Sequence, residues 1–207
     1  MENSFANYPS LQGKNILITG GASGIGKELV KGFAEQGANV AFLDLNDEAG
    51  ERLSLDIGEN VFFQKCDLKE VGNLKSSIEK LRAKIGLFDV LVNNAAHDDR
   101  HNWQDVTEAY WDERFATNLR HQFFTIQSVA KDMIQKGGGS IVNIGSNSWM
   151  EAVGNFPAYA TAKSAVHGLS RTLARDLGKH RIRVNTVVPG WIMTDRQKEL
   201  WVTPEGL

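Results

Sequence analysis

The stretch that decides the fold reads TGGASGIG and spans residues 19–26. It follows a short apolar run at 15–19, and a helical pattern begins inside it. Glycines at 20, 24 and 26 allow a tight turn, let backbone N–H groups approach a phosphate, and let the helix pack close to a sheet. Because structural turns also use glycine, the preceding strand and the following helix carry the prediction of a pyrophosphate-binding loop.

Apolar segments rich in β-branched residues alternate with helical patterns along the whole chain. The predicted strands lie at 15–19, 39–43, 61–65, 88–92, 140–144 and 183–188. The predicted helices follow the first strand as far as Gly37 and recur at 47–55, 71–85, 103–135 and 157–178. Most strands lack the polar alternation of a half-exposed strand, which indicates burial on both faces. The pattern predicts an α/β fold, a doubly wound Rossmann-like parallel sheet with helices on both faces.

The composition is that of an ordinary globular protein. The 207 residues are 42% hydrophobic and 23% charged, with a net charge of -2, and show no linker, so we expect one domain over 1–207. This charge gives no reason to expect nucleic acid or an anionic membrane as a partner. No signal peptide or apolar run of about 20 residues is visible. Cys66 is the only cysteine, which fits a reducing cytoplasm.

Asp44 ends the second predicted strand, eighteen residues after Gly26. An acidic side chain there can accept hydrogen bonds from the adenosine ribose hydroxyls of a dinucleotide, and its charge repels a 2′-phosphate. Leu45 and Asn46 follow and offer no cation for that phosphate, so the pattern favours NAD over NADP. The alternative is that Asp44 only starts a turn or caps the next helix.

Further landmarks follow the glycine loop in a recognisable order. They are Asn93-Asn94-Ala95 after the fourth strand, Asn118 in the long helix, Ser146 thirteen residues before Tyr159, Lys163 four residues beyond it, and Pro189-Gly190 after the sixth strand. With the glycine loop, this set resembles the short-chain dehydrogenase/reductase family over residues 13 to about 196. An isolated Tyr-x-x-x-Lys is more often a plain amphipathic turn, and its neighbours therefore decide the matter.

The resemblance implies a role for each matching position. The implied catalytic residues are Asn118, Ser146, Tyr159 and Lys163. The implied cofactor contacts are Gly20, Ser23, Gly24, Ile25 and Gly26 at the pyrophosphate, Asp44, Asp67, Leu68, Asn94 and Ala95 at the adenosine, and Tyr159, Lys163, Pro189, Ile192 and Thr194 at the nicotinamide end. One departure is Ala96, where the family usually has glycine, and we expect its methyl group to be accommodated.

Tyr159 and Lys163 lie one helical turn apart, on one face of the predicted helix. A tyrosine with a pKa near ~10 is a poor base at neutral pH, but the charges of Lys163 and an oxidised nicotinamide favour the phenolate. We therefore expect Tyr159, with a lowered pKa, to take the proton from a substrate hydroxyl. Ser146 would steady the substrate oxygen, and Asn118 would hold a water that links Lys163 to solvent.

Several segments resemble one group within the family, the bacterial NAD-dependent D-xylose 1-dehydrogenases. They are YPSLQGK (8–14), HDDRH (97–101), DVTEAYWDER (105–114), TNLRHQFF (117–124), SNSWM (146–150) and TDRQKELWVTPEG (194–206). The resemblance implies oxidation of a pentose at C1 to the lactone. Other readings are a dehydrogenase of a polyol or 3-hydroxyacyl group, and an NAD-binding form without turnover.

A sugar requires several hydrogen-bonding groups and an aromatic or apolar wall. The candidate substrate contacts are Ser146, Asn147, Trp149 and Tyr159, with Glu151, Asp98, Asp99, Arg100 and His101 as further candidates. The alternatives are that Trp149 only packs, and that segment 97–101 is a solvated loop whose charges pair among themselves. His97, His101 and His121 do not form a convincing metal set, and we expect no metal.

Family chains normally continue through a further helix and a seventh strand. We therefore expect this chain to lack that strand and to leave the sixth with an open edge, and the sequence leaves open whether it is a fragment. Apolar residues on 107–134 and 157–178 exceed what the sheet can cover. In the resembling family these helices pair about a two-fold axis, so we expect a homodimer through them and a tetramer only in a full-length form.

Overall fold

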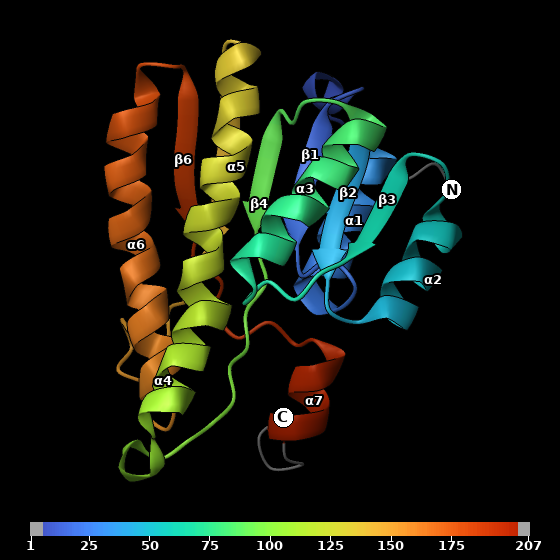
Figure 1. Ribbon diagram of the computed structural model, residues 1–207. Helices are drawn as coiled ribbons and strands as arrows, with labels where there is room; N and C mark the ends of the chain where they lie inside the picture. Colours follow the sequence, from blue (N-terminus) through green and yellow to red (C-terminus); the bar gives the residue numbers. More distant parts are fainter. Residues whose placement is uncertain (1–5, 203–207) are drawn as a thin grey trace.

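The computed structural model describes residues 6–202 and contains a six-stranded parallel sheet (Figure 1). The strands are β1 (Asn15–Thr19), β2 (Asn39–Asp44), β3 (Val61–Lys65), β4 (Val90–Asn93), β5 (Gly139–Ile144) and β6 (Ile182–Val187). They lie in the order β3-β2-β1-β4-β5-β6, and all neighbours are parallel. This order is that of a doubly wound fold, so the predicted fold class is confirmed. Residues 203–207, at the end of the predicted substrate-side segment, lie outside the described residues.

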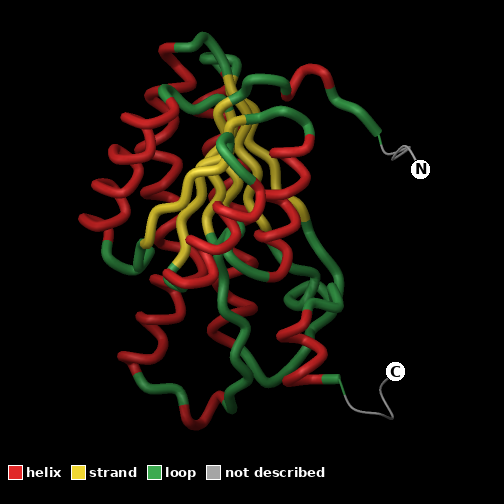
Figure 2. Tube along the Cα trace, turned by 90° about the vertical axis from the view of Figure 1, so that its right-hand side faces the viewer, coloured by secondary structure: helices red, strands yellow, loops and turns green. Residues whose placement is uncertain are grey.

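Helices cover both faces of the sheet, as Figure 2 shows. They are α1 (Gly24–Glu35), α2 (Asp47–Ile57), α3 (Val71–Ile85), α4 (Glu108–Phe115), α5 (His121–Gln135), α6 (Pro157–Gly178) and α7 (Asp195–Trp201). Side chains of α1 and α2 pack on one face, and side chains of α3, α5 and α6 pack on the other. Within residues 6–202, no helix combines the length and the apolar character required to cross a membrane.

Burial on both faces explains why the strands read as continuous apolar runs. In β1, Ile16 and Ile18 belong to the cluster under α1 and α2, whereas Leu17 belongs to the cluster under α3 and α5. All three side chains are fully buried. Burying each contributes about 1.5–3 kcal/mol, so consecutive apolar residues stabilise both layers at once.

The helical pattern at 103–135 is not one helix, and that prediction was wrong at its start. A 3-10 turn at Trp103–Asp105 is followed by an extended residue, and α4 begins after Thr107, whose hydroxyl accepts a hydrogen bond from the amide of Tyr110 at 3.2 Å. A π-turn, labelled η3 (Ala116–Arg120), then joins α4 to α5. Such turns widen a helix locally and often occur at functional sites.

Two short elements had no counterpart in the sequence analysis. They are the 3-10 turn Pro9–Leu11 and helix α7, whose first residue follows the capping hydroxyl of Thr194. Seven residues are too few for helical periodicity to be recognised. Helix α7 lies beyond the carboxyl ends of the strands (Figure 1), where ligands bind in doubly wound folds.

Candidate active site

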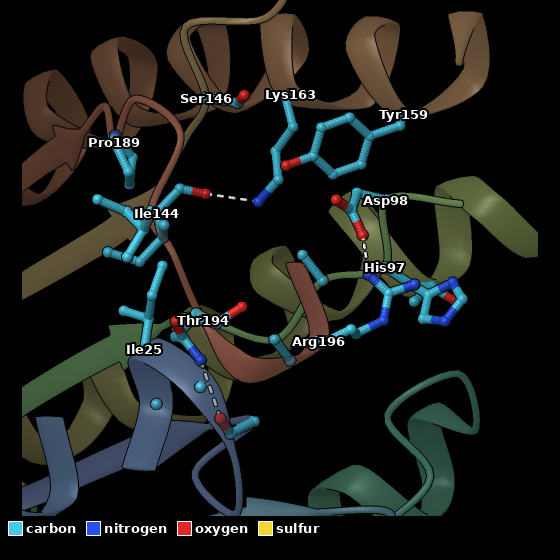
Figure 3. A pocket seen from close by; sticks show the side chains of 18 of the residues that line it. Ile25, His97, Asp98, Ile144, Ser146, Tyr159, Lys163, Pro189, Thr194 and Arg196 are labelled. Atoms are coloured by element: carbon cyan, nitrogen blue, oxygen red, sulfur yellow. Dashed lines mark hydrogen bonds and ion pairs between the residues drawn. The ribbon is translucent and has the colours of Figure 1, made fainter. Parts of the chain in front are cut away.

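A cavity of about 930 Å³ opens at the carboxyl ends of the strands, where the order switches between β1 and β4. Loops after these strands, the start of α6 and helix α7 line it (Figure 3). Every residue predicted to contact the cofactor lines this one cavity. The segments that the sequence analysis assigned to the two ends of a dinucleotide are therefore brought together by the fold.

The glycine loop has no room for side chains at its turn. Gly20 has a φ of +69°, and a Cβ placed on Gly26 would lie 1.8 Å from the carbonyl oxygen of Gly20. Asn94 braces the loop by donating its Nδ2 to the carbonyls of Gly20 (2.9 Å) and Thr19 (3.1 Å). Helix α1 starts at Gly24, so its unpaired N–H groups meet the cavity, which fits a pyrophosphate.

Asp44 lines the predicted adenosine end of the cavity and also accepts hydrogen bonds from the loop. Its two carboxylate oxygens accept hydrogen bonds from the amides of Ala22 (2.9 Å) and Asn46 (3.0 Å). The cap of α2 is Asn46, whose side chain accepts from the amide of Ala49 at 3.1 Å. Asp44 thus makes a turn but caps no helix. Lys27 of α1 lines the same cavity, a cation that sequence reasoning missed because only the fold brings it near β2.

The predicted nicotinamide contacts follow β6 and turn back toward the glycine loop. Pro189, Ile192 and Thr194 line the cavity. Thr194 lies close to α1, because its Cγ2 would be 3.4 Å from a Cβ placed on Gly24. Ala96 also lines the cavity and is exposed, so its methyl group is not pressed against the fold.

Tyr159 and Lys163 project from α6 into the cavity, as their spacing predicted (Figure 3). Lys163 is 1% exposed, and its Nζ donates to the carbonyl of Ile144 at 2.7 Å and lies 5.7 Å from the Tyr159 ring centroid. Ser146 follows β5, and its Oγ donates to the hydroxyl of Ser148 at 2.9 Å. Ser148, which sequence reasoning missed, therefore orients the predicted catalytic serine.

The expected lowering of the Tyr159 pKa is not produced by the protein's own groups. Burial raises the pKa of Tyr159 to about 12; hydrogen bonding with Ser146 lowers it, while the charge of Asp98 raises it further. Burial also lowers the pKa of Lys163 to about 8. The desolvation that accompanies packing beside a cavity thus outweighs the proximity of the two side chains.

Asn118 acts as a brace and does not line the cavity. The side chain is fully buried in the π-turn. Its Oδ1 accepts from the amide of His97 (2.8 Å), and its Nδ2 donates to the carbonyls of Arg114 (2.9 Å) and His97 (3.2 Å). Asn118 therefore positions the loop after β4, and its role in holding a water stays a prediction.

The predicted substrate contacts divide into two groups. Asn147 and Glu151 line the cavity and are joined by a 2.8 Å hydrogen bond. Trp149 does not line the cavity, because it packs edge-on against His167 of α6 with ring centroids 5.1 Å apart. The structure thus supports the packing alternative for Trp149.

The loop at 97–101 is anchored to other elements. Asp98 and Arg100 line the cavity, whereas Asp99 and His101 do not. Arg196 of α7 pairs with both Asp98 and Asp99, so the charges are not balanced within the loop alone. Although burial by itself would raise the pKa of Asp98, contacts with Gln197 and Arg196 lower it and keep the carboxylate ionised.

The histidines near the cavity have structural partners. The Nδ1 of His97 lies 3.1 Å from a carboxylate oxygen of Asp99, and the Nε2 of His121 lies 3.2 Å from the carbonyl of Ala95. Burial lowers the pKa of His121 to about 3, so this side chain is neutral. Among residues 6–202, no group of three or more His, Cys, Asp or Glu is arranged to hold a metal ion.

A half-buried tyrosine and a buried lysine face a glycine loop across the switch point of a doubly wound sheet, which is the arrangement of an oxidoreductase that uses a nicotinamide dinucleotide. Comparison with known proteins agrees. The family described as short chain dehydrogenase matches residues 14–205. The chain therefore belongs to the short-chain dehydrogenase family, as the resemblance implied, and is a dehydrogenase that acts on CH–OH groups.

Two relatives and one solved structure illustrate the similarity. The chain is 49% identical to D-xylose 1-dehydrogenase of Caulobacter vibrioides (strain NA1000 / CB15N), over 98% of this chain and 81% of that protein. It is 44% identical to "Probable galactose dehydrogenase GalD" of Rhizobium meliloti (strain 1021), over 98% and 80%. The 3-ketoacyl-(acyl-carrier-protein) reductase from Brucella melitensis complexed with NADH has a TM-score of 0.85 and 26% identity, over 89% of this chain and 78% of that one.

Proposed function

We propose that this protein oxidises an aldopentose such as D-xylose at C1 to the lactone, with NAD as the hydride acceptor and Tyr159 as the base. The observation that carries the proposal is the single cavity in which Ser146, Tyr159 and Lys163 meet a wall of polar side chains. Asn147 and Glu151 form one part of this wall, and a sugar ring requires such a dense set of donors and acceptors. The D-xylose and galactose dehydrogenases among the relatives support the choice of an aldose.

In this mechanism the residues of the chain hold the sugar and move one proton. Ser146 Oγ donates to the C1 oxygen, and Tyr159 Oη takes the hydroxyl proton as C1 loses its hydride. NAD, when bound, supplies the hydride acceptor and a positive ring charge. Lys163, with Nζ beside Ile144 O and close to the Tyr159 ring, adds a second positive charge and would hold the cofactor ribose.

The energetic demand on these charges follows from the pKa of Tyr159, which is about 12. Lowering this pKa from about 12 to about 7 requires that the phenolate be stabilised over the neutral phenol by about 7 kcal/mol. Two positive charges in a partly dry cavity are of the right order for this. On this proposal, removal of the proton would require the charge that the oxidised cofactor supplies when it is bound.

The choice of NAD rests on Asp44. Its carboxylate lies at the end of β2 beside the glycine loop, where an adenosine ribose would bind, and repels a 2′-phosphate. Lys27 of α1 lines the same cavity and partly offsets this repulsion. We expect the ribose hydroxyls to bind the carboxylate, because Lys27 offers only one flexible cation.

The test is NAD reduction, followed by absorbance, with D-xylose, other aldoses, polyols and 3-hydroxyacyl substrates. The expected result is turnover with an aldopentose that is at least about tenfold more efficient than with any polyol or acyl substrate. Lactone formation is checked by trapping the product with hydroxylamine. Preferential oxidation of a polyol or acyl substrate would replace the aldose proposal, and equal rates with NADP would remove the role of Asp44.

A further inference from the structure

The first turn of α6, which carries Tyr159, has no capping side chain of its own. The first N–H groups of a helix lack partners within it, and a side chain at the N-cap usually accepts one of them. Here the N-cap is Phe156, which makes no such bond, and Pro157 has no N–H. The amide of Ala158, a fully buried residue next to Tyr159, is therefore the first donor that needs an acceptor.

His101 supplies this acceptor from a distant part of the chain. The amide of Ala158 donates to His101 Nε2 at 3.2 Å, although the residues are 57 positions apart. The amide of His101 in turn donates to the carbonyl of Asn155 at 2.7 Å, so the loop after β4 and the start of α6 are joined twice. The second bond involves only backbone atoms, so replacing the His101 side chain would remove the bond to the Ala158 amide and leave the bond to Asn155 in place.

The hydrogen-bond network assigns the ring proton of His101. Nε2 accepts from Ala158, so the proton lies on Nδ1, which is 2.9 Å from the carbonyl oxygen of Asp99 and 2.9 Å from the hydroxyl of Tyr110. A carbonyl can only accept, and it therefore fixes this tautomer. The ring also packs edge-on against Tyr110 of α4, with centroids 4.9 Å apart.

We propose that His101 is a positioning residue for Tyr159, holding the first turn of α6 through the Ala158 amide so that the phenol meets the substrate oxygen. The link is short, because Tyr159 follows Ala158 directly and its ring stacks on Phe156 at 5.3 Å and 15°. An error of about 1 Å in the placement of a reacting group costs about 100-fold in rate. The effect on turnover rests on the proposed function, whereas the cap exists without it.

His101 is not placed to bind the substrate directly, because it does not line the cavity. Along this loop, Asp98 and Arg100 line the cavity, whereas Asp99 and His101 do not. Arg100 stacks on Phe156 at 3.9 Å, so neighbouring residues of the loop support the same turn of α6 from two sides. His101 thus acts on the reaction only through α6.

A matched pair of substitutions distinguishes the role of His101 Nε2 from that of Nδ1. The amide oxygen of glutamine in His101→Gln can reach the position of Nε2 and accept from Ala158, whereas the shorter side chain of His101→Asn reaches only the position of Nδ1. We expect His101→Gln to keep kcat within about threefold of the parent, and His101→Asn to lower kcat at least about tenfold with the KM for NAD within twofold. Tyr110→Phe, which leaves the Ala158 bond intact, should keep kcat within about threefold.

Hydrogen exchange of the peptide covering 156–163 gives a readout that needs no substrate. The Ala158 amide should exchange at the parental rate in His101→Gln and at least about tenfold faster in His101→Asn, with peptides of α5 as the internal reference. If the parent oxidises no aldose, the proposed function fails while the exchange result still decides the role of His101.

Three results would overturn the inference: equal kcat and exchange in the two His101 variants, fast exchange or low kcat in His101→Gln, or an NAD KM that rises together with the loss of kcat in His101→Asn. The His101→Gln result alone is decisive if the asparagine variant does not fold.

Discussion

Replacing Tyr159 by phenylalanine separates the chemistry of the phenol from the packing of its ring. The substitution removes one oxygen atom, and the remaining ring can keep its stacking on Phe156. A single hydrogen bond of a tyrosine hydroxyl contributes about 1 kcal/mol to the free energy of unfolding. The variant should therefore fold, with its urea midpoint only slightly lower than that of the parent.

The effect on turnover should be far larger. Tyr159 Oη is the atom that takes the substrate proton in the proposed reaction, and a positioned base contributes about 10²- to 10⁴-fold to the rate. This range corresponds to about 3–5 kcal/mol in activation free energy, several times the expected loss of stability. The KM for NAD should change by less than about threefold, because the cofactor contacts of the glycine loop and Lys163 remain.

The assay compares kcat, the KM for NAD and urea unfolding for the parent, Tyr159→Phe and Tyr8→Phe. Tyr8 is 57% exposed and does not line the cavity, so its variant controls for the loss of a phenol elsewhere. A kcat for Tyr159→Phe within tenfold of the parent, with normal folding, would refute the assignment of Tyr159 as the base.

Three further predictions concern the same molecule. Because the charges of Lys163 and the cofactor must bring the pKa of Tyr159 from about 12 to near neutrality, the oxidation rate should rise by up to about tenfold per unit between pH 6 and 7 and level off above this; a rate that is flat from pH 6 to 7 contradicts the base role. The double variant Asp44→Asn and Leu45→Arg should raise the NADP-to-NAD ratio of kcat/KM at least about tenfold. Asparagine at position 44 still accepts a hydrogen bond from a loop amide but no longer repels the 2′-phosphate, and arginine at position 45 can bind that phosphate. An unchanged ratio would show that Asp44 does not select the cofactor. We expect a homodimer through α4, α5 and α6, with Phe123 of α5, which is 39% exposed, at the interface. Phe123→Glu places a charge there and should give a monomer in light scattering. A monomeric parent would exclude this interface.

The sequence was sufficient for features whose physics is local. Apolar runs and helical periodicity reflect burial that recurs along each element, so the strand positions along the chain and the bounds of α3 and α6 could be predicted. The glycine loop could also be predicted from the sequence, because Gly20 and Gly26 lie where no side chain fits. The separation of Tyr159 and Lys163 by one helical turn likewise places both side chains at the cavity without further information.

Only the tertiary structure decided how distant segments meet. The bond from Ala158 to His101 and the ion pair of Arg196 with Asp98 join residues 57 and 98 positions apart, and no periodicity records such contacts. The π-turn within 103–135 depends on hydrogen bonds between Asn118 and the loop after β4.

The protonation of Tyr159 was likewise beyond the sequence. Spacing alone predicts that Lys163 lowers the pKa of Tyr159, yet burial raises it to about 12. The free energy of ionising a side chain depends on how much water the surrounding chain excludes, and this is known only when every segment that covers the side chain is in place.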